Sequence, residues 1–102
     1  MKVVMVCSGG MSSAIVVKAI LKEADKQNFE LEMIAVGSGE IEEILKSSSY
    51  DLLLVAPQVK HQFATFEGYA NESGVPIDKV EPMGYTPLGA PKTLLQIKKY
   101  SK

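Results

Sequence analysis

The chain has 102 residues, of which 46% are hydrophobic and 23% charged, and its formal net charge at pH 7 is −1. This length predicts one domain, residues 1–102, around one hydrophobic core. The nearly neutral charge argues against nucleic acid as a partner. A single cysteine cannot form an internal disulfide, and the apolar N-terminal stretch is too short to span a bilayer. We therefore expect a cytoplasmic protein without direct membrane insertion.

Strand and helix patterns alternate along the chain. The predicted strands are residues 2–7, 29–36, 51–55 and 79–83. The predicted helices are residues 12–27, 40–48, 58–73 and a last one from residue 88 or 91 to residue 100. The first and third strands are nearly continuous apolar runs, which is typical of strands buried on both faces. The order βαβαβαβα predicts an α/β fold with a four-stranded parallel sheet and helices on both faces, an open sheet of flavodoxin-like or low-molecular-weight-phosphatase-like type.

The only cysteine, Cys7, lies between the first predicted strand and the first predicted helix. The residues after it, SGGMSS, are mostly small, so their backbone N–H groups and the helix dipole can stabilise a thiolate and hold a phosphate dianion. A lone cysteine in a cytosolic protein is most often a small buried hydrophobe. At the junction of strand, turn and helix, we instead expect a nucleophile that accepts and passes on a phosphoryl group.

Two further segments are predicted to lie at the same edge of the sheet, because ligands of parallel sheets bind at the carboxyl ends of the strands. Residues 56–58 follow the third predicted strand, and residues 84–86 follow the fourth. All eleven basic residues of the chain are lysine. Without an arginine to grip phosphate bidentately, an anion site here depends on backbone amides, hydroxyl groups and at most a lysine.

With these residues placed, the chain resembles the EIIB components of the bacterial phosphoenolpyruvate-dependent sugar phosphotransferase system, in the lactose/cellobiose/chitobiose group. The segment CSGGMSS from Cys7 to Ser13 is similar to the family's Cys-Ser-Ala-Gly-Met-Ser-Thr/Ser after an N-terminal strand. Pro57-Gln58 corresponds to a common Gly-Pro-Gln, and Tyr85 to a tyrosine after the fourth strand. The length of the chain also fits a freestanding EIIB protein.

The chain departs from the family's pattern at several positions. Gly9 stands where alanine is common, and Ala56 replaces the usual glycine. The last loop lacks the Asp-Gly pair that often follows the tyrosine, and Pro87 and Pro91 lie in this region. The differences in the last loop concern its contact with partner proteins, whereas Gly9 loosens the cysteine loop without removing any backbone amide.

The resemblance implies a phosphotransferase in which a phosphohistidine of an EIIA protein phosphorylates Cys7. Cys7 would pass the group to a sugar, such as the β-disaccharides cellobiose, chitobiose or lactose, during transport by the membrane protein EIIC. Contacts at the rim of the site are expected from Gln58 and Tyr85. We expect a monomer without metal or cofactor. The implied phosphate-binding loop consists of Ser8, Gly9, Gly10, Met11, Ser12, Ser13 and Ala14.

Two other classes of protein remain open at this point. Low-molecular-weight tyrosine phosphatases and arsenate reductases also place a cysteine loop after the first strand, but their loop needs an arginine where this chain has Ser13. Receiver domains need acidic residues at the end of the first strand and a phospho-accepting aspartate on the third, which Val6-Cys7 and Val55-Ala56 do not supply. Flavin-binding modules usually have aromatic shields, whereas this chain has no tryptophan. His61 has no partner at ligand spacing, so we expect a helix residue and not a phosphoryl relay.

Overall fold

Four parallel strands form the centre of the protein in the computed structural model, which describes residues 1–8 and 11–101 and gives the backbone alone for residues 11–13. The strands are β1 (Lys2–Cys7), β2 (Glu32–Gly37), β3 (Leu52–Val55) and β4 (Ile77–Lys79), in the order β2-β1-β3-β4. The two central strands, β1 and β3, are almost entirely buried, as their apolar runs predict. The predicted parallel sheet is confirmed.

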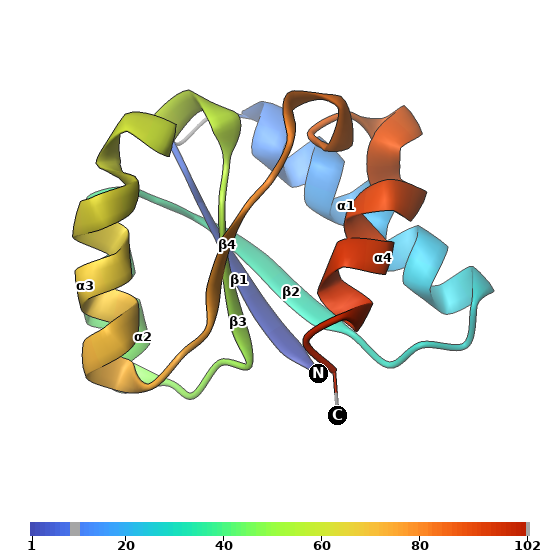
Figure 1. Cartoon of the computed structure of the whole chain (residues 1–102). Coiled ribbons are helices and arrows are strands. Elements are labelled where there is room, and N and C mark those ends of the chain that lie inside the picture. The colour runs from blue at the N-terminus through green and yellow to red at the C-terminus, as the bar shows by residue number, and fades with distance from the viewer. Residues whose placement is uncertain (9–10, 102) are drawn as a thin grey trace.

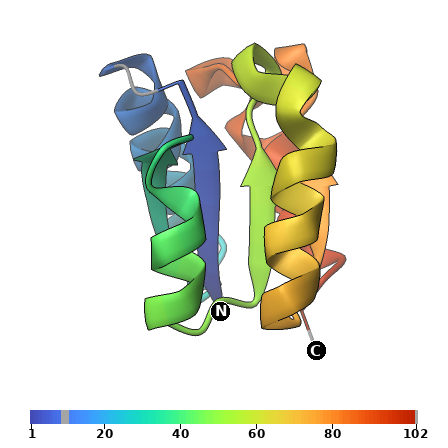
Figure 2. The same cartoon turned by 90° about the vertical axis from the view of Figure 1, so that its left-hand side faces the viewer.

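Two pairs of helices cover the two faces of this sheet (Figure 1). Helices α1 (Met11–Lys26) and α4 (Ala90–Lys98) pack against each other on one face. Helices α2 (Ile41–Ser47) and α3 (Phe63–Ser73) form the other layer, which lies in front of the sheet in Figure 2. Three 3₁₀ segments connect the elements: η1 (Pro57–Gln62), η2 (Pro82–Gly84) and η3 (Pro87–Gly89). Helices on both faces of the sheet are thereby confirmed.

Side chains from the strands and the four α-helices form the hydrophobic core. Ile20 of α1 and Ile97 of α4 are fully buried on one side of the sheet, and Ile41 of α2 and Phe66 of α3 are buried on the other. Burial of each such side chain contributes about 1.5–3 kcal/mol to folding. No helix among the described residues is both long and apolar enough to cross a bilayer.

The prediction for the third helix was partly wrong. Residues 58–62 belong to the 3₁₀ segment η1, and the α-helix begins only at Phe63. Pro57 opens η1, and Val59 has non-helical backbone angles (φ −118°, ψ 18°), so the α-helical hydrogen bonds cannot start there. The segment after β3 is therefore a tight turn followed by a helix.

The predicted bounds of two strands were also wrong. The fourth strand was expected at residues 79–83, but β4 ends at Lys79 and Pro82 begins η2. A last sheet hydrogen bond runs from the Val80 N–H to the Val55 carbonyl (2.9 Å). The second strand begins at Glu32, three residues later than predicted, because Asn28 (φ 55°) turns the chain after α1.

Candidate functional site

Cys7 is the last residue of β1, at the carboxyl edge of the sheet. Its backbone lies in register with Gly37, the last residue of β2. Only 2% of Cys7 is exposed, and its Sγ donates a hydrogen bond to the carbonyl oxygen of Val36 (3.4 Å). In this conformation the sulfur is directed toward β2 and is almost fully covered.

Helix α1 begins four residues after Cys7, at Met11. Its 16 residues include no acidic side chain in the first turn, so the positive end of its dipole is directed at the loop without a competing carboxylate. Ser8 and Ala14 are exposed. Of the remaining predicted loop residues, Gly9 and Gly10 lie outside the described residues, as do the side chains of Met11, Ser12 and Ser13.

The segments after β3 and β4 lie at the same edge of the sheet as Cys7 (Figure 1). The N–H of Ala56 donates to the carbonyl of Val6 (3.0 Å), so η1 starts directly beside the end of β1. Gln58 is exposed on η1. Tyr85 packs partly buried against the core, and its hydroxyl is buried without a hydrogen-bond partner among the described residues. Both predicted rim residues thus belong to segments at the Cys7 edge.

Thr93 of α4 holds the loop that carries Tyr85 through a buried hydrogen bond. Thr93 is 1% exposed, and its hydroxyl donates to the carbonyl of Gly84 (2.7 Å). A Cβ atom on Gly84 would lie 2.6 Å from the Thr93 Oγ1, so this close approach requires glycine. Sequence reasoning missed Thr93; its one signal is a small polar residue at a buried position of a helix.

A second set of contacts closes the same loop between η2 and η3. The Thr86 hydroxyl donates to the Met83 carbonyl (3.1 Å) and accepts from the Gly89 N–H (3.1 Å). A Cβ on Gly89 would lie 2.1 Å from the Met83 carbonyl oxygen. The proline-containing loop that carries Tyr85 is therefore tightly packed.

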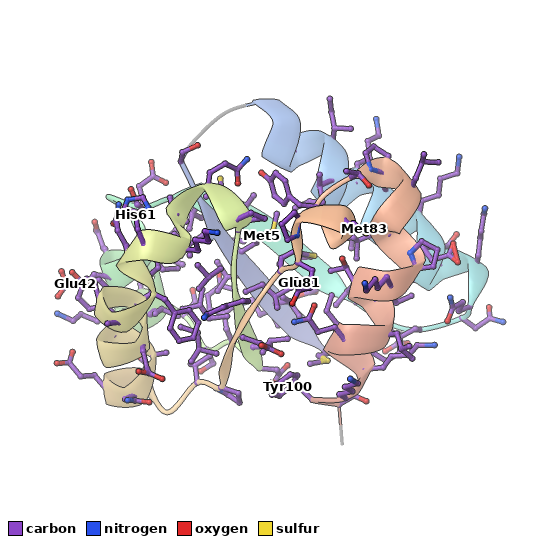
Figure 3. The ribbon with its side chains drawn as sticks, turned by 45° about the horizontal axis from the view of Figure 1, so that its top comes forward. Met5, Glu42, His61, Glu81, Met83 and Tyr100 are labelled. Atoms are coloured by element: carbon purple, nitrogen blue, oxygen red, sulfur yellow. The ribbon has the colours of Figure 1, made fainter. Side chains whose placement is uncertain are left out.

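His61 lies at the Cys7 edge of the sheet, on the opposite side from Met83 of η2 (Figure 3). His61 is exposed on η1, where its ring lies 3.2 Å from the side-chain nitrogen of Gln62. It was expected on an α-helix and is found on a 3₁₀ segment. Within residues 1–8 and 11–101, no three His, Cys, Asp or Glu side chains are grouped as a metal site would require.

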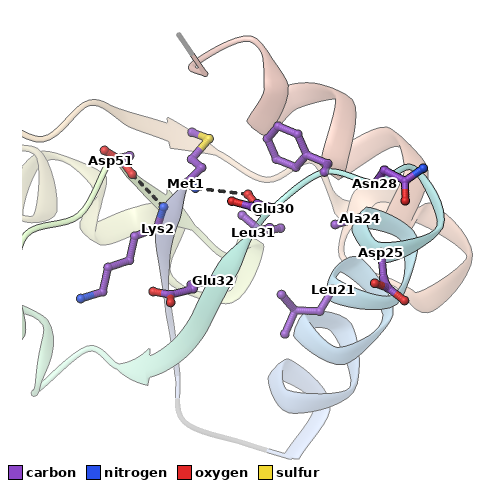
Figure 4. A pocket seen from close by; sticks show the side chains of 11 residues that line it. Met1, Lys2, Leu21, Ala24, Asp25, Asn28, Glu30, Leu31, Glu32 and Asp51 are labelled. Atoms are coloured by element: carbon purple, nitrogen blue, oxygen red, sulfur yellow. Dashed lines mark hydrogen bonds between the residues drawn. The ribbon is translucent and has the colours of Figure 1, made fainter.

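An open cavity of about 840 Å³ lies at the opposite edge of the sheet, near the amino ends of β1 and β2 (Figure 4). Its wall is acidic and includes Asp25, Glu30, Glu32 and Asp51. The Asp51 carboxylate accepts the N–H of Lys2 (2.7 Å), and the N-terminal amine donates to the Glu30 carbonyl (3.2 Å). These four carboxylates outnumber the two cationic groups of the lining, Lys2 and the N-terminal amine, so the cavity does not favour a phosphoryl group.

Comparison with known structures shows the same fold in EIIB proteins. The lactose-specific IIB component domain from Streptococcus pneumoniae superposes with a TM-score of 0.85 at 24% identity, covering 100% of this chain and 98% of that one. The cellobiose-specific IIB component from Borrelia burgdorferi has a TM-score of 0.76 at 25% identity, covering 98% and 90%.

Sequence comparison gives relatives of two lengths. The chain is 30% identical over 86 residues to the lactose-specific EIICB component of Lactococcus lactis subsp. lactis, covering 84% of this chain but only 15% of that protein. It is 27% identical over 95 residues to the galactose-specific EIIB component of Lactococcus lactis subsp. cremoris, covering 90% and 88%. Residues 2–96 match the family described as the lactose/cellobiose-specific IIB subunit of the PTS system. The chain therefore belongs to the lactose/cellobiose-specific EIIB family of the phosphotransferase system.

Proposed function

We propose that Cys7 is the phosphoryl carrier of this EIIB component. In the first step the Cys7 thiolate attacks the phosphorus of a phosphohistidine on EIIA, an S–P bond forms, and the N–P bond breaks with release of the imidazole. In the second step a sugar hydroxyl attacks the same phosphorus, the S–P bond breaks, and the thiolate returns. The hydroxyl proton passes to a base or to solvent. The observation that carries the proposal is the place of the only thiol, between the end of β1 and the start of α1.

The phosphoryl group would be held by the backbone amides of residues 8–14. Residues 1–102 include no arginine, so they cannot supply a guanidinium clamp. The start of α1 supplies partial positive charge without an acidic residue in its first turn. Together these features support a site in which fixed dipoles stabilise the charge on the transferring group.

Phosphoryl transfer also requires a change in the Cys7 side chain. Its Sγ is buried and bonded to the Val36 carbonyl, whereas an attacking sulfur has to approach the donor in line. A thiol is a weak hydrogen-bond donor, so the contact with Val36 opposes rotation only slightly. We infer that Cys7 turns out of the sheet edge when a phosphorylated partner docks.

The relatives support the choice of partners. The EIICB relatives, as their names state, combine EIIC and EIIB in one protein, which favours EIIC as the partner that presents the sugar. The names of the relatives include lactose, galactose, cellobiose and oligo-β-mannoside, so we propose a sugar of this class, with a β-disaccharide as the first candidate. We propose that residues 1–102 act as a monomeric domain on the cytoplasmic side of the membrane.

The test is intact-mass spectrometry after incubation with phosphorylated EIIA. The wild-type chain should gain one phosphoryl group, Cys7→Ser should gain none, and the matched control His61→Gln should gain it fully. Phosphate that persists in Cys7→Ser, or that maps to His61, would contradict the proposal. The linkage should show the pH-stability profile of a thiophosphate and not that of phosphohistidine. Hydrolysis of a phosphotyrosine analogue by the protein alone would instead indicate a phosphatase.

A further inference from the structure

The charged side chains are divided unequally between the two helix layers. The α1–α4 side, counted to Lys99 at the end of α4, contains six lysines and two carboxylates, Glu23 and Asp25, which gives a net charge of +4. The side formed by η1, α2 and α3, counted from Glu40 at the start of α2, contains five glutamates and two lysines, which gives a net charge of −3. The two faces of the sheet therefore carry opposite charge, although the net charge of the whole chain is only −1. The six lysines are Lys18, Lys22, Lys26, Lys92, Lys98 and Lys99.

Most of these lysines form two stripes on neighbouring helices. On α1, Ile15, Lys18, Lys22 and Lys26 follow one another at intervals of three or four residues, and all are exposed. The second stripe runs from η3 along α4 and consists of Leu88, Lys92, Leu95 and Lys99. Because α1 packs against both η3 and α4, the stripes lie side by side. We call the surface formed by these eight residues the α1–α4 face.

Three apolar side chains protrude from this face among the lysines. Leu88 is 95% exposed, Leu95 62% and Ile15 56%. The exposed lysines of the face form no ion pair within the described part of the chain, where the recorded pair is Lys46 with Glu42 on the other layer. Lys98, which is partly buried, contacts Gln27 and the ring of Phe29. The α1–α4 face thus presents unneutralised ammonium groups together with aliphatic side chains.

We propose that the α1–α4 face binds the anionic lipid headgroups of a membrane surface. Lysines attract anionic headgroups as mobile point charges, and aliphatic side chains between them can enter the headgroup region. Protein–protein interfaces, in contrast, are enriched in aromatic residues and depleted in lysine, whereas five of the eight residues of this face are lysines and none is aromatic. The acidic α2–α3 layer on the other side of the sheet would point away from the membrane.

This inference rests on the proposed function, because transfer to a sugar at EIIC takes place at a membrane. The Cys7 edge lies at the top of Figure 1, whereas the α1–α4 face lies at the right. With the α1–α4 face on the lipid, the Cys7 edge would stay uncovered and directed along the membrane surface. Lipid binding would therefore keep the carrier near its acceptor without blocking Cys7.

Vesicle sedimentation tests the proposal on the full chain without any partner protein. The probes are phosphatidylcholine vesicles and vesicles of phosphatidylcholine with phosphatidylglycerol, both at low salt. The wild type should bind the second kind only, and added salt should release it. Lys18→Gln with Lys92→Gln should weaken binding about tenfold or more. The matched control, Lys46→Gln with Lys60→Gln on the acidic layer, has the same net charge and should bind like the wild type.

Each other outcome would overturn the proposal. These outcomes are equal weakening in the two double variants, or no binding of the wild type to anionic vesicles, which would indicate that the face recognises a protein and not lipid. Cys7→Ser should bind vesicles like the wild type. Because vesicle binding needs no phosphoryl transfer, and mass gain from EIIA needs no membrane, failure of this inference and failure of the proposed function are separate results.

Discussion

The hydroxyl of Tyr100 donates a hydrogen bond to the Oδ2 of Asp78 (3.0 Å), which joins the end of the chain to the edge strand β4. The Oδ1 of the same carboxylate accepts the Lys79 N–H (2.8 Å). Burial raises the pKa of Asp78, but hydrogen bonds from the Gln96 side chain, the Lys79 N–H and the Tyr100 hydroxyl outweigh it. The pKa of Asp78 is therefore below its ordinary value of 3.8. Burial, followed by the contact with Asp78, raises the pKa of Tyr100 above 10.0.

This pair predicts a pH window for its contribution to stability. A lowered carboxyl pKa stabilises the fold above the unfolded value of 3.8, and this contribution is lost as the pH falls further. A raised tyrosine pKa favours the fold while the phenol is protonated, and this contribution is lost as the pH rises above 10.0. Tyr100→Phe should lower the free energy of unfolding at pH 7 by about 1 kcal/mol. Urea unfolding at pH 7 and at successively lower pH values below 3.8 checks this: a loss that stays the same as the pH falls would contradict the assigned role of the Asp78 carboxylate.

The contact between Thr93 and Gly84 predicts the effect of removing one hydroxyl. Thr93→Val keeps the shape of the side chain but leaves the buried Gly84 carbonyl without its donor, which should cost about 1–3 kcal/mol. Thr93→Ser keeps the donor and is the matched control, so it should lose less. Denaturant unfolding of both variants measures the difference. If the serine variant loses as much as the valine variant, packing and not the hydrogen bond holds the loop.

Substitution of two glycines by alanine should change the stability of the fold in opposite directions. In Gly89→Ala the new Cβ would lie 2.1 Å from the Met83 carbonyl oxygen, so the loop must shift at a cost of about 1–3 kcal/mol. Gly68 lies inside α3, and a Cβ there meets no atom within 4 Å. Gly68→Ala should therefore stabilise the protein by about 0.5–1 kcal/mol. Thermal unfolding checks both signs, and a stable Gly89→Ala protein would show that the loop is less rigid than its contacts imply.

Tyr85 allows folding and function to be separated. Its buried hydroxyl has no partner within the described residues, so Tyr85→Phe should leave the free energy of unfolding unchanged or slightly raised. If the hydroxyl serves the phosphoryl group or a docked partner, as the rim position predicts, the same variant should transfer phosphoryl groups more slowly. Unfolding and transfer rates are measured on one preparation. A destabilised variant with normal transfer would assign the hydroxyl to the fold.

The parts of the fold that long apolar runs determine were predictable from the sequence. Strand β1 has the predicted bounds, because its unbroken apolar run is flanked by Lys2 and by a turn of small residues, which mark where the strand begins and ends. Strand β4 was misplaced because it is a three-residue edge strand, where one hydrogen-bonded neighbour gives little sequence signal. The kink in η1 lies at Val59, whose apolar side chain fits a helical pattern although its backbone angles are not helical.

The candidate site was predictable in position but not in detail. Cys7, Gln58 and Tyr85 belong to segments at one edge, as the rule for parallel sheets predicts. The bond from the Cys7 thiol to the Val36 carbonyl depends on how β2 pairs with β1, and register between distant strands cannot be read from either strand alone. The role of Thr93 likewise arises from contacts between residues nine positions apart in two different segments.

The last prediction concerns which groups hold the phosphoryl group. Gly10→Pro removes a backbone N–H donor and restricts φ, so it should abolish acceptance by Cys7, whereas Ser13→Ala should only weaken it. Lys60 is exposed on η1, at the Cys7 edge of the sheet, so Lys60→Ala is the sharpest test of a side-chain cation. Its rate of phosphoryl uptake at saturating phosphorylated EIIA should stay near that of the wild type. A loss beyond about a hundredfold, about 2.7 kcal/mol of barrier, would show that a lysine and not the backbone stabilises the transferring group.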